Sequence, residues 1–280
     1  MKNILVLIDL SPRSAKIAQL ALKLAKQINA NLLLCDVLNA PLNKVILFED
    51  NEYWPFEDEY YPNAEALVNQ LKQNQDNAPI GRTFIDCASI SDFNTDKIKD
   101  LVVEKEICMM IVGVQHLTDL KASNADNYAR QIIDHANCPV LVIPEHTRVK
   151  EIDRIAYLTD LRYCEIQVVN FLKAFNAYIF VTHISASGIP DMEDGYAQSL
   201  LSDAFAAQVG YNKLFLRNIK GENRKNDLET IVSTADIKVI ALVNKKHQML
   251  DRFIQTEPGK KRDYHNLPLL VIPYMNRYSW

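Results

Sequence analysis

Glycine is scarce in this sequence. Only 7 of the 280 residues are glycine, about 2.5% against an average of about 7%, and no two of them lie within five residues of each other. A dinucleotide-binding fingerprint requires three glycines in six positions, and a phosphate-binding P-loop requires two glycines before a lysine, because the backbone must approach phosphate closely. The sequence therefore excludes both motifs.

Several other features are missing as well. The five cysteines are odd in number and widely spaced, which predicts reduced thiols and a cytoplasmic location. No uninterrupted apolar run of about 18 residues is present, and the six histidines form neither His-x-x-x-His nor His-Glu-x-x-His, so we expect no metal site. The net charge of −4 predicts neither a nucleic-acid nor a membrane partner.

No set of catalytic residues can be assembled from the sequence. The nucleophile elbow Gly-x-Ser-x-Gly is absent, and no acid or base pairs with the carboxylates near residues 119–134. We therefore predict that the chain is not an enzyme. An unrelated α/β enzyme would require an acid, a base or a nucleophile that come together only in three dimensions.

Short apolar runs alternate with amphipathic segments in the first half of the chain. The apolar runs at 4–8, 32–37, 83–87, 107–112 and 140–143 predict strands that are buried on both faces. Helical spacing predicts helices at 12–28, 64–71, 98–102 and 128–135, the first of them beginning with Ser11 as N-cap and Pro12 at its first position. Such alternation predicts an open parallel sheet with helices on both faces.

The same order of segments returns in the second half. Residues 4–9 correspond to 155–160, Asn29 to Asn176, Glu106 to Asp236, and 138–144 to 267–273. We therefore predict a duplicated α/β domain, with the first copy at 1–146 and the second at 151–280.

These segments resemble the tandem form of the universal stress protein family. The resemblance rests on Ile-Leu-Val-Leu-Ile-Asp-Leu-Ser at 4–11, on the acidic residue before the apolar strand that ends at Gly113, and on Asn-Cys-Pro-Val-Leu-Val-Ile-Pro at 137–144. It implies two doubly wound domains of the adenine nucleotide alpha hydrolase-like kind. Each would have five parallel strands in the order 3-2-1-4-5, and the domains would pair about a pseudo-two-fold axis.

The resemblance also implies where a nucleotide would bind. Family members that bind ATP carry a glycine-rich pattern after strand four, and here that pattern falls on Gly113, His116, Asp126 and Asn127. Only one glycine of three remains, and Asp126 would bring a carboxylate to the phosphates. In the second half the same positions are Leu242, Lys245, Gln255 and Thr256, so we predict a degenerate phosphate loop in both halves.

The resemblance further implies a vestigial nucleotide site in the first half, at Asp9, Val37, Gly113 and Asn127. Asp160 and Ile184 correspond to the first two of these in the second half. Asp9 also has a structural interpretation, in which its carboxylate receives backbone amides of the following helix.

Two further segments suggest interactions. Residues 48–62 combine six acidic with six aromatic residues, which predicts either an insertion that folds back on the protein or a partner site. Residues 245–262 carry six cations against two carboxylates, which predicts either a solvated helical face or a site for phosphate or an acidic partner. We favour the solvated face, since no aromatic residues that would stack on bases are interleaved.

The sequence therefore leads to one hypothesis and one alternative. The first is a cytoplasmic, non-catalytic stress-response protein without a cofactor, acting as a homodimer or an intramolecular domain pair, or by binding an unknown protein partner. The alternative retains ATP or AMP binding in the first domain, with weak ATP hydrolysis.

Overall fold

The computed structural model describes most of the chain. The described residues are 2–37, 63–76, 83–90, 95–121, 128–159, 166–184, 195, 199, 209–219, 224–244, 248–254 and 263–274. The chain divides into two compact units, the first comprising Met1–Gln115 with Asp119–Glu145 and the second His116–Thr118 with His146–Trp280. The two domains that the sequence predicts, at 1–146 and 151–280, stay a prediction.

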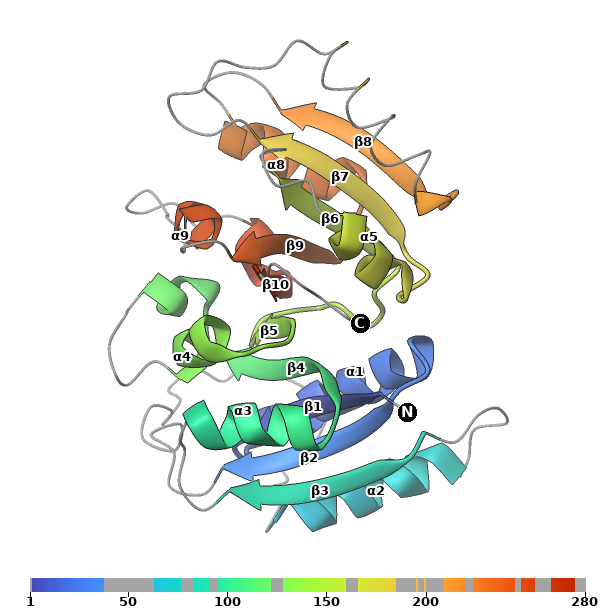
Figure 1. Cartoon of the computed structure of the whole chain (residues 1–280), viewed down its shortest axis with the longest axis vertical. Coiled ribbons are helices and arrows are strands. Elements are labelled where there is room, and N and C mark those ends of the chain that lie inside the picture. Colours follow the sequence, from blue (N-terminus) through green and yellow to red (C-terminus); the bar gives the residue numbers. More distant parts are fainter. Residues whose placement is uncertain are drawn as a thin grey trace. The chain divides into compact units, whose positions relative to one another are not determined.

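Five parallel strands build the sheet of the first unit, in the order β3-β2-β1-β4-β5 (Figure 1). Their bounds are β1 (Asn3–Ile8), β2 (Asn31–Val37), β3 (Ile85–Ile90), β4 (Ile107–Val114) and β5 (Val140–Pro144). The five apolar runs of the first half thus form the predicted strands. Ile4, Leu5 and Val6 of β1 are fully buried, as expected for a central parallel strand covered on both faces.

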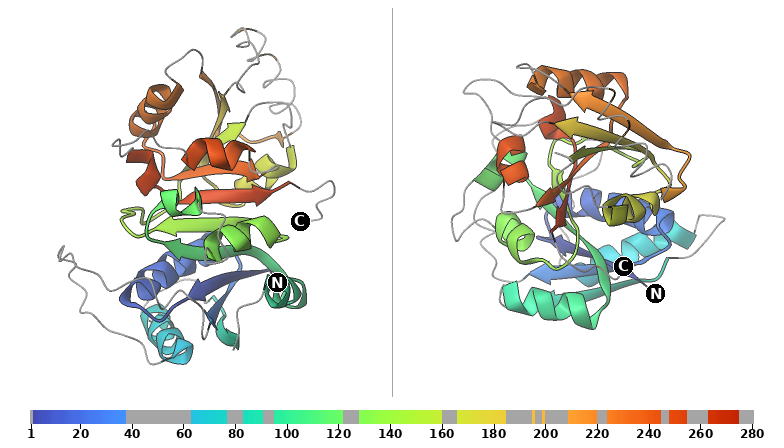
Figure 2. Two further views of the ribbon diagram at one scale, coloured as in Figure 1. Left: turned by 90° about the vertical axis from the view of Figure 1, so that its left-hand side faces the viewer. Right: turned by 45° about the horizontal axis from the view of Figure 1, so that its top comes forward.

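Helices cover both faces of this sheet. They are α1 (Pro12–Gln27), α2 (Ala64–Asp76), α3 (Thr95–Glu104), α4 (Tyr128–His135) and the short 3-10 helix η2 (Leu117–Lys121). Figure 2 shows α1 and α2 on one face and α3 on the other. This is the doubly wound α/β arrangement that the alternation predicts.

The second unit repeats the strand order. Its strands β6 (Arg154–Thr159), β7 (Tyr178–Ile184), β8 (Leu214–Ile219), β9 (Val239–Asn244) and β10 (Leu269–Pro273) are parallel and run β8-β7-β6-β9-β10. Its described helices are α5 (Ile166–Lys173), α8 (Arg224–Thr234), α9 (Gln248–Ile254) and the 3-10 helix η4 (Asp263–Asn266).

Left-handed residues stand at corresponding turns of the two units. Asn29 and Asn176 have φ of 54° and 50°, and each lies just before the second strand of its sheet. Glu106 and Asp236, with φ of 49° and 52°, precede the fourth strand. A helix commonly ends in a left-handed residue, where asparagine is tolerated well.

The strand pairing corrects one correspondence between the two halves. Ile4 pairs with Met109 in the first unit and Ile155 with Val239 in the second. Counting four residues on from Met109 and Val239 makes Val243 the counterpart of Gly113, whereas the sequence comparison had placed Leu242 there. The conclusion that the second half lacks this glycine is unchanged.

Among the described residues, no helix combines the length and the apolar character needed to cross a membrane.

Candidate functional site

The predicted nucleotide site lies at the carboxyl ends of neighbouring strands. Asp9 directly follows β1, Val37 ends β2, and Gly113 lies near the end of β4. Because β1 pairs with both β2 and β4, the fold brings these three positions to the edge where open α/β sheets bind ligands. Asn127 lies outside the described residues.

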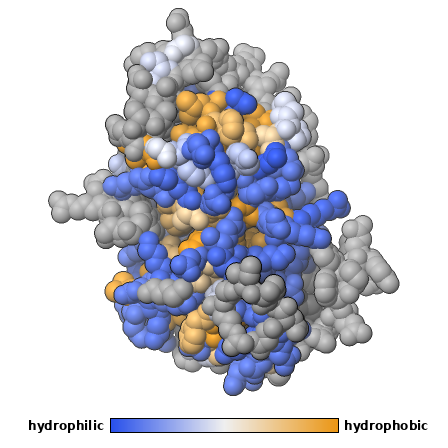
Figure 3. All heavy atoms as spheres, turned by 90° about the vertical axis from the view of Figure 1, so that its right-hand side faces the viewer, coloured by the Kyte–Doolittle hydropathy of each residue, from blue (hydrophilic) through white to orange (hydrophobic). Residues whose placement is uncertain are grey.

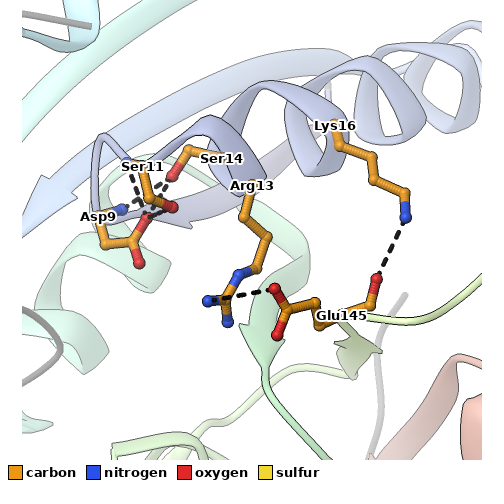
Figure 4. A network of polar contacts seen from close by, with 6 residues as sticks. All are labelled: Asp9, Ser11, Arg13, Ser14, Lys16 and Glu145. Carbon is orange, nitrogen blue, oxygen red and sulfur yellow. Dashed lines mark hydrogen bonds and ion pairs between the residues drawn. The ribbon is translucent and has the colours of Figure 1, made fainter. Parts of the chain in front are cut away.

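Asp9 is the centre of a local hydrogen-bond network (Figure 4). Its Oδ1 accepts hydrogen bonds from Ser11 N at 3.1 Å and from the hydroxyls of Ser11 and Ser14, both at 2.6 Å. The backbone N–H of Asp9 donates to Ser14 Oγ at 3.1 Å. The intervening Leu10 has φ of 60°, a left-handed conformation that bulky residues adopt only where their surroundings impose it.

This network corrects the role predicted for Ser11. Ser11 is the N-cap residue of α1, but its side chain makes no capping hydrogen bond and donates instead to Asp9. Asp9 and the first turn of α1 are therefore held together by contacts within the chain.

Charged groups beside this network also bond to the protein itself. Arg13 Nη2 lies 3.7 Å from Glu145 Oε1, and their side chains are only 11% and 24% exposed. Lys16 Nζ donates to the backbone oxygen of Glu145 at 3.2 Å. The pKa of Lys16 is lowered, chiefly because burial penalises its charged form. Both cations on this turn of α1 are thus directed toward the residue that follows β5 (Figure 4).

Gly113 permits close packing of α1 on β4. A Cβ atom at this position would overlap the Cδ1 methyl of Ile17, and it would also lie 4.0 Å from Cδ of Arg13. Ile17 is 5% exposed and belongs to the core. An apolar group of α1 therefore fills the space that a side chain at position 113 would occupy.

The chain after β4 forms η2 at Leu117–Lys121, whereas residues 122–127, which complete the ATP-binding pattern, lie outside the described residues. Leu117 and Leu120 of η2 are 1% and 0% exposed. Arg130 of α4, itself 7% exposed, donates through Nη1 to Leu120 O at 3.1 Å, so hydrogen bonding fixes the end of η2. His116, a glycine position in the ATP-binding pattern, has its ring 5.6 Å from that of His146.

The corresponding edge of the second unit differs in chemistry. His183 and Thr159 are paired in register and are 3% and 5% exposed, where the first unit has Asp36 paired with Ile8. Ile184 ends β7. Asp160, Lys245, Gln255 and Thr256 lie outside the described residues.

Two other predictions fall largely outside the described residues. The acidic aromatic segment 48–62 lies wholly outside them, and only 248–254 of the basic segment 245–262 is described, as α9. Within the described part of the chain, no three His, Cys, Asp or Glu side chains gather in a way that could hold a metal ion.

Four residues at the carboxyl edge of the first sheet were not predicted from the sequence, namely Arg13, Ser14, Ile17 and Glu145. Ser14 follows Ser11 by three residues, about one helical turn, so the spacing Asp9-x-Ser11-x-x-Ser14 is a signal that the sequence offers. The contacts of Glu145 with α1 span 129 and 132 residues of sequence, and no local pattern predicts them.

Comparisons with known proteins agree with this architecture. The family model described as "Universal stress protein family" matches residues 1–144. A universal stress protein from Archaeoglobus fulgidus DSM 4304 is 12% identical, with 98% of this chain and 97% of that chain covered and a TM-score of 0.60. A functionally unknown protein from Pseudomonas aeruginosa PAO1 is 14% identical over 98% of this chain and 92% of that chain, with a TM-score of 0.48.

A universal stress protein in complex with cAMP is also similar, at 14% identity over 51% of this chain and 97% of that chain, with a TM-score of 0.33. A search of curated proteins finds no match. Since the family model covers more than half of the residues, the chain belongs to the universal stress protein family. The α/β fold with its parallel strands is the one that this membership implies.

Proposed function

We propose that the chain is a non-catalytic tandem universal stress protein of the cytoplasm, with domains at 1–146 and 151–280. Its phosphate loop is degenerate, it needs no cofactor, and it acts through its surface, by pairing with a second copy or by binding a protein partner. The observation that carries this proposal is that Asp9 and Gly113, two of the positions expected to meet a nucleotide, are engaged by side chains of α1.

The first support is the hydrogen bonding of Asp9. Its Oδ1 already accepts three hydrogen bonds from Ser11 and Ser14, and a ligand hydroxyl or amide that approached this oxygen would compete with these donors. An exchange of one hydrogen bond for another yields little net binding free energy.

The second support is the loss of backbone access to phosphate. Phosphate-binding loops depend on glycines whose amides can close on the ligand. At the first of these positions, Gly113 is packed against Ile17, and the second is His116. Leu117 and Leu120 just after it are buried apolar residues, which opposes phosphate binding by this part of the chain.

A second candidate function is adenine-nucleotide binding by the first domain, with slow hydrolysis. It is favoured by one observation: Asp9, Val37 and Gly113 end neighbouring strands at the ligand-binding edge of the sheet. Under this candidate the base and ribose would occupy that edge, and the phosphates would need donors other than a glycine-rich loop.

One experiment separates the two candidates. The purified full-length chain is denatured, and the supernatant is analysed by mass spectrometry for ATP, ADP, AMP and cAMP. We expect no nucleotide in stoichiometric amount. Release of about one nucleotide per chain would establish the second candidate and contradict the first.

A further inference from the structure

Exposed aromatic rings lie on the sheet of the second unit. Figure 3 shows hydrophobic residues reaching the surface among hydrophilic ones. Four large hydrophobic side chains of the described residues are exposed, namely Phe84 (65%), Val103 (72%), Tyr178 (42%) and Phe215 (39%). The last two belong to the adjacent strands β7 and β8, and their rings lie near each other.

The two exposed rings are supported by a third. Phe180 and Phe215 are directly opposite each other in the β7–β8 register, and their rings are stacked with centroids 5.2 Å apart and an interplanar angle of 19°. The ring of Tyr178 lies 6.0 Å from that of Phe215. Phe180 is 9% exposed and packs beside Phe215, while Tyr178 and Phe215 are 42% and 39% exposed.

Two cations flank the aromatic residue of β8. Phe215 and Arg217 are two residues apart in β8, which places them on one face of the strand, and Lys213 lies in the turn directly before it. Lys213 Nζ lies 5.5 Å from the centroid of the Tyr178 ring and donates to the O and Oδ1 atoms of Asn176, both at 2.9 Å. Arg217 Nη1 donates to Leu216 O at 3.1 Å. In the part of the chain that the structure describes, both cations thus donate to neutral oxygen atoms.

The fold itself does not require this surface, because the first unit builds the same face differently. Leu33 pairs with Asp86 on β2 and β3 as Phe180 pairs with Phe215 on β7 and β8. The first unit thus has Asp86 in place of Phe215 and, two residues on, Ala88 in place of Arg217. One unit presents a carboxylate and a methyl group where the other presents a flat ring and a guanidinium.

From this juxtaposition we infer that Tyr178, Phe215, Lys213 and Arg217 form a binding site for single-stranded nucleic acid at the amino ends of β7 and β8. The two rings offer surfaces on which unpaired bases stack, and the two cations lie where phosphates of the same strand can meet them. The net charge of −4 predicted no nucleic-acid partner, but that value averages over 280 residues, whereas binding depends on the charge of this face. The site uses no residue of the nucleotide edge described above and does not depend on the proposed function.

The test is the binding of a short fluorescein-labelled oligouridylate to the full-length chain, followed by fluorescence anisotropy. We expect saturable binding that weakens with salt, with a slope of log Kd against log salt of about 1.4 for two phosphate contacts on a single strand. Phe215→Leu keeps an apolar side chain but removes the flat ring, and it should weaken binding about fivefold or more. Arg217→Ala should halve the salt slope, and its exposed side chain makes it a variant that folds.

Phe84→Leu in the first unit is the matched control, because it also replaces an exposed phenylalanine, here the residue directly before β3. We expect it to leave the affinity unchanged, and circular dichroism verifies that every variant is folded. The inference is overturned if no oligouridylate binds, if Phe215→Leu and Arg217→Ala bind it as the parent does, or if Phe84→Leu weakens it equally. Binding of a poly(Glu,Tyr) peptide without binding of oligouridylate would also overturn it, in favour of an acidic protein partner.

Discussion

The Cδ1 methyl of Ile17 occupies the space that a Cβ atom on residue 113 would need. Gly113 lies in β4 and Ile17 in α1, so the helix packs closely on the strand at this contact within the core of the first unit. In the ATP-binding pattern the same glycine would serve the approach of phosphate. The contact gives Gly113 a packing role that is independent of any ligand.

Exchange of Gly113 for alanine tests this packing role. Gly113→Ala should lower the free energy of unfolding by about 1–3 kcal/mol, because overpacking a core forces neighbouring groups to shift. Ile17→Val removes the Cδ1 atom and by itself should cost about 0.5–1.5 kcal/mol. In the double variant the valine makes room for the alanine methyl, so the combined loss should be smaller than the sum by about 0.5 kcal/mol or more. Urea denaturation of the four proteins measures these quantities.

Additive losses in this cycle would contradict the packing role of Gly113. The single variant Ile17→Val is the control in this cycle. It measures the cost of losing one buried methyl group while Gly113 stays unchanged.

Asp9 gives a second prediction. Asp9→Ala removes the acceptor for Ser11 N and for the hydroxyls of Ser11 and Ser14, and we expect it to lower the free energy of unfolding by about 1–3 kcal/mol. Asp9→Asn keeps an oxygen at the same place and should restore much of that loss. An Asp9→Ala protein as stable as the parent in thermal denaturation would show that the network contributes nothing.

Much of the fold could be predicted from local sequence. The run at 4–8 predicts β1 because a parallel strand covered on both faces is apolar throughout. Asn29 and Asn176 correspond in sequence, and both stand in left-handed turns before a second strand, since asparagine tolerates that conformation better than most residues. Glu106 and Asp236 correspond in the same way before the fourth strands, but of these two residues only aspartate shares the tolerance of asparagine for this conformation.

The site could be predicted only in part. The sequence places Asp9 and Gly113 at strand ends, but it does not reveal that Ile17 fills the glycine position. The contact of Glu145 with Arg13 joins residues 132 positions apart, and it depends on β5 ending beside α1. The short helix η2 was also not predicted, because five residues show no clear helical period. Tertiary packing decides each of these features.

Asp36 predicts a dependence of stability on pH. It is 6% exposed, and burial raises its pKa in the folded state. The folded chain therefore holds this proton more tightly than the unfolded chain, and stability falls as the pH rises from the unfolded pKa of about 3.9 through the raised folded value. Asp36→Asn removes this penalty, so it should raise the melting temperature at pH 7 and raise it less near pH 4.

The matched control for this measurement is Asp86→Asn on β3, where the side chain is exposed. It should change the melting temperature little at either pH. A decrease in the melting temperature of Asp36→Asn at pH 7, or an equal effect at both pH values, would contradict the prediction.

The thiols should differ in reactivity. Burial raises the pKa of both Cys35 and Cys138 to about 12, and these side chains are 0% and 2% exposed, so neither forms the reactive thiolate at neutral pH. Cys87 is only half-buried. Iodoacetamide should therefore alkylate Cys87 before Cys35 or Cys138, as followed by peptide mass spectrometry. Earlier labelling of Cys138 would contradict the burial on which this order depends.

The most direct test of the central claim, that the first unit no longer holds a nucleotide, is a thermal denaturation series of the full chain with increasing ATP, AMP and cAMP. A ligand at 100 times its Kd stabilises the folded state by about 2.7 kcal/mol, which for a domain of this size raises the melting temperature by several degrees. We predict no saturable increase with any of the three. A saturable increase that Asp9→Ala abolishes would show that the edge of the sheet still binds a nucleotide.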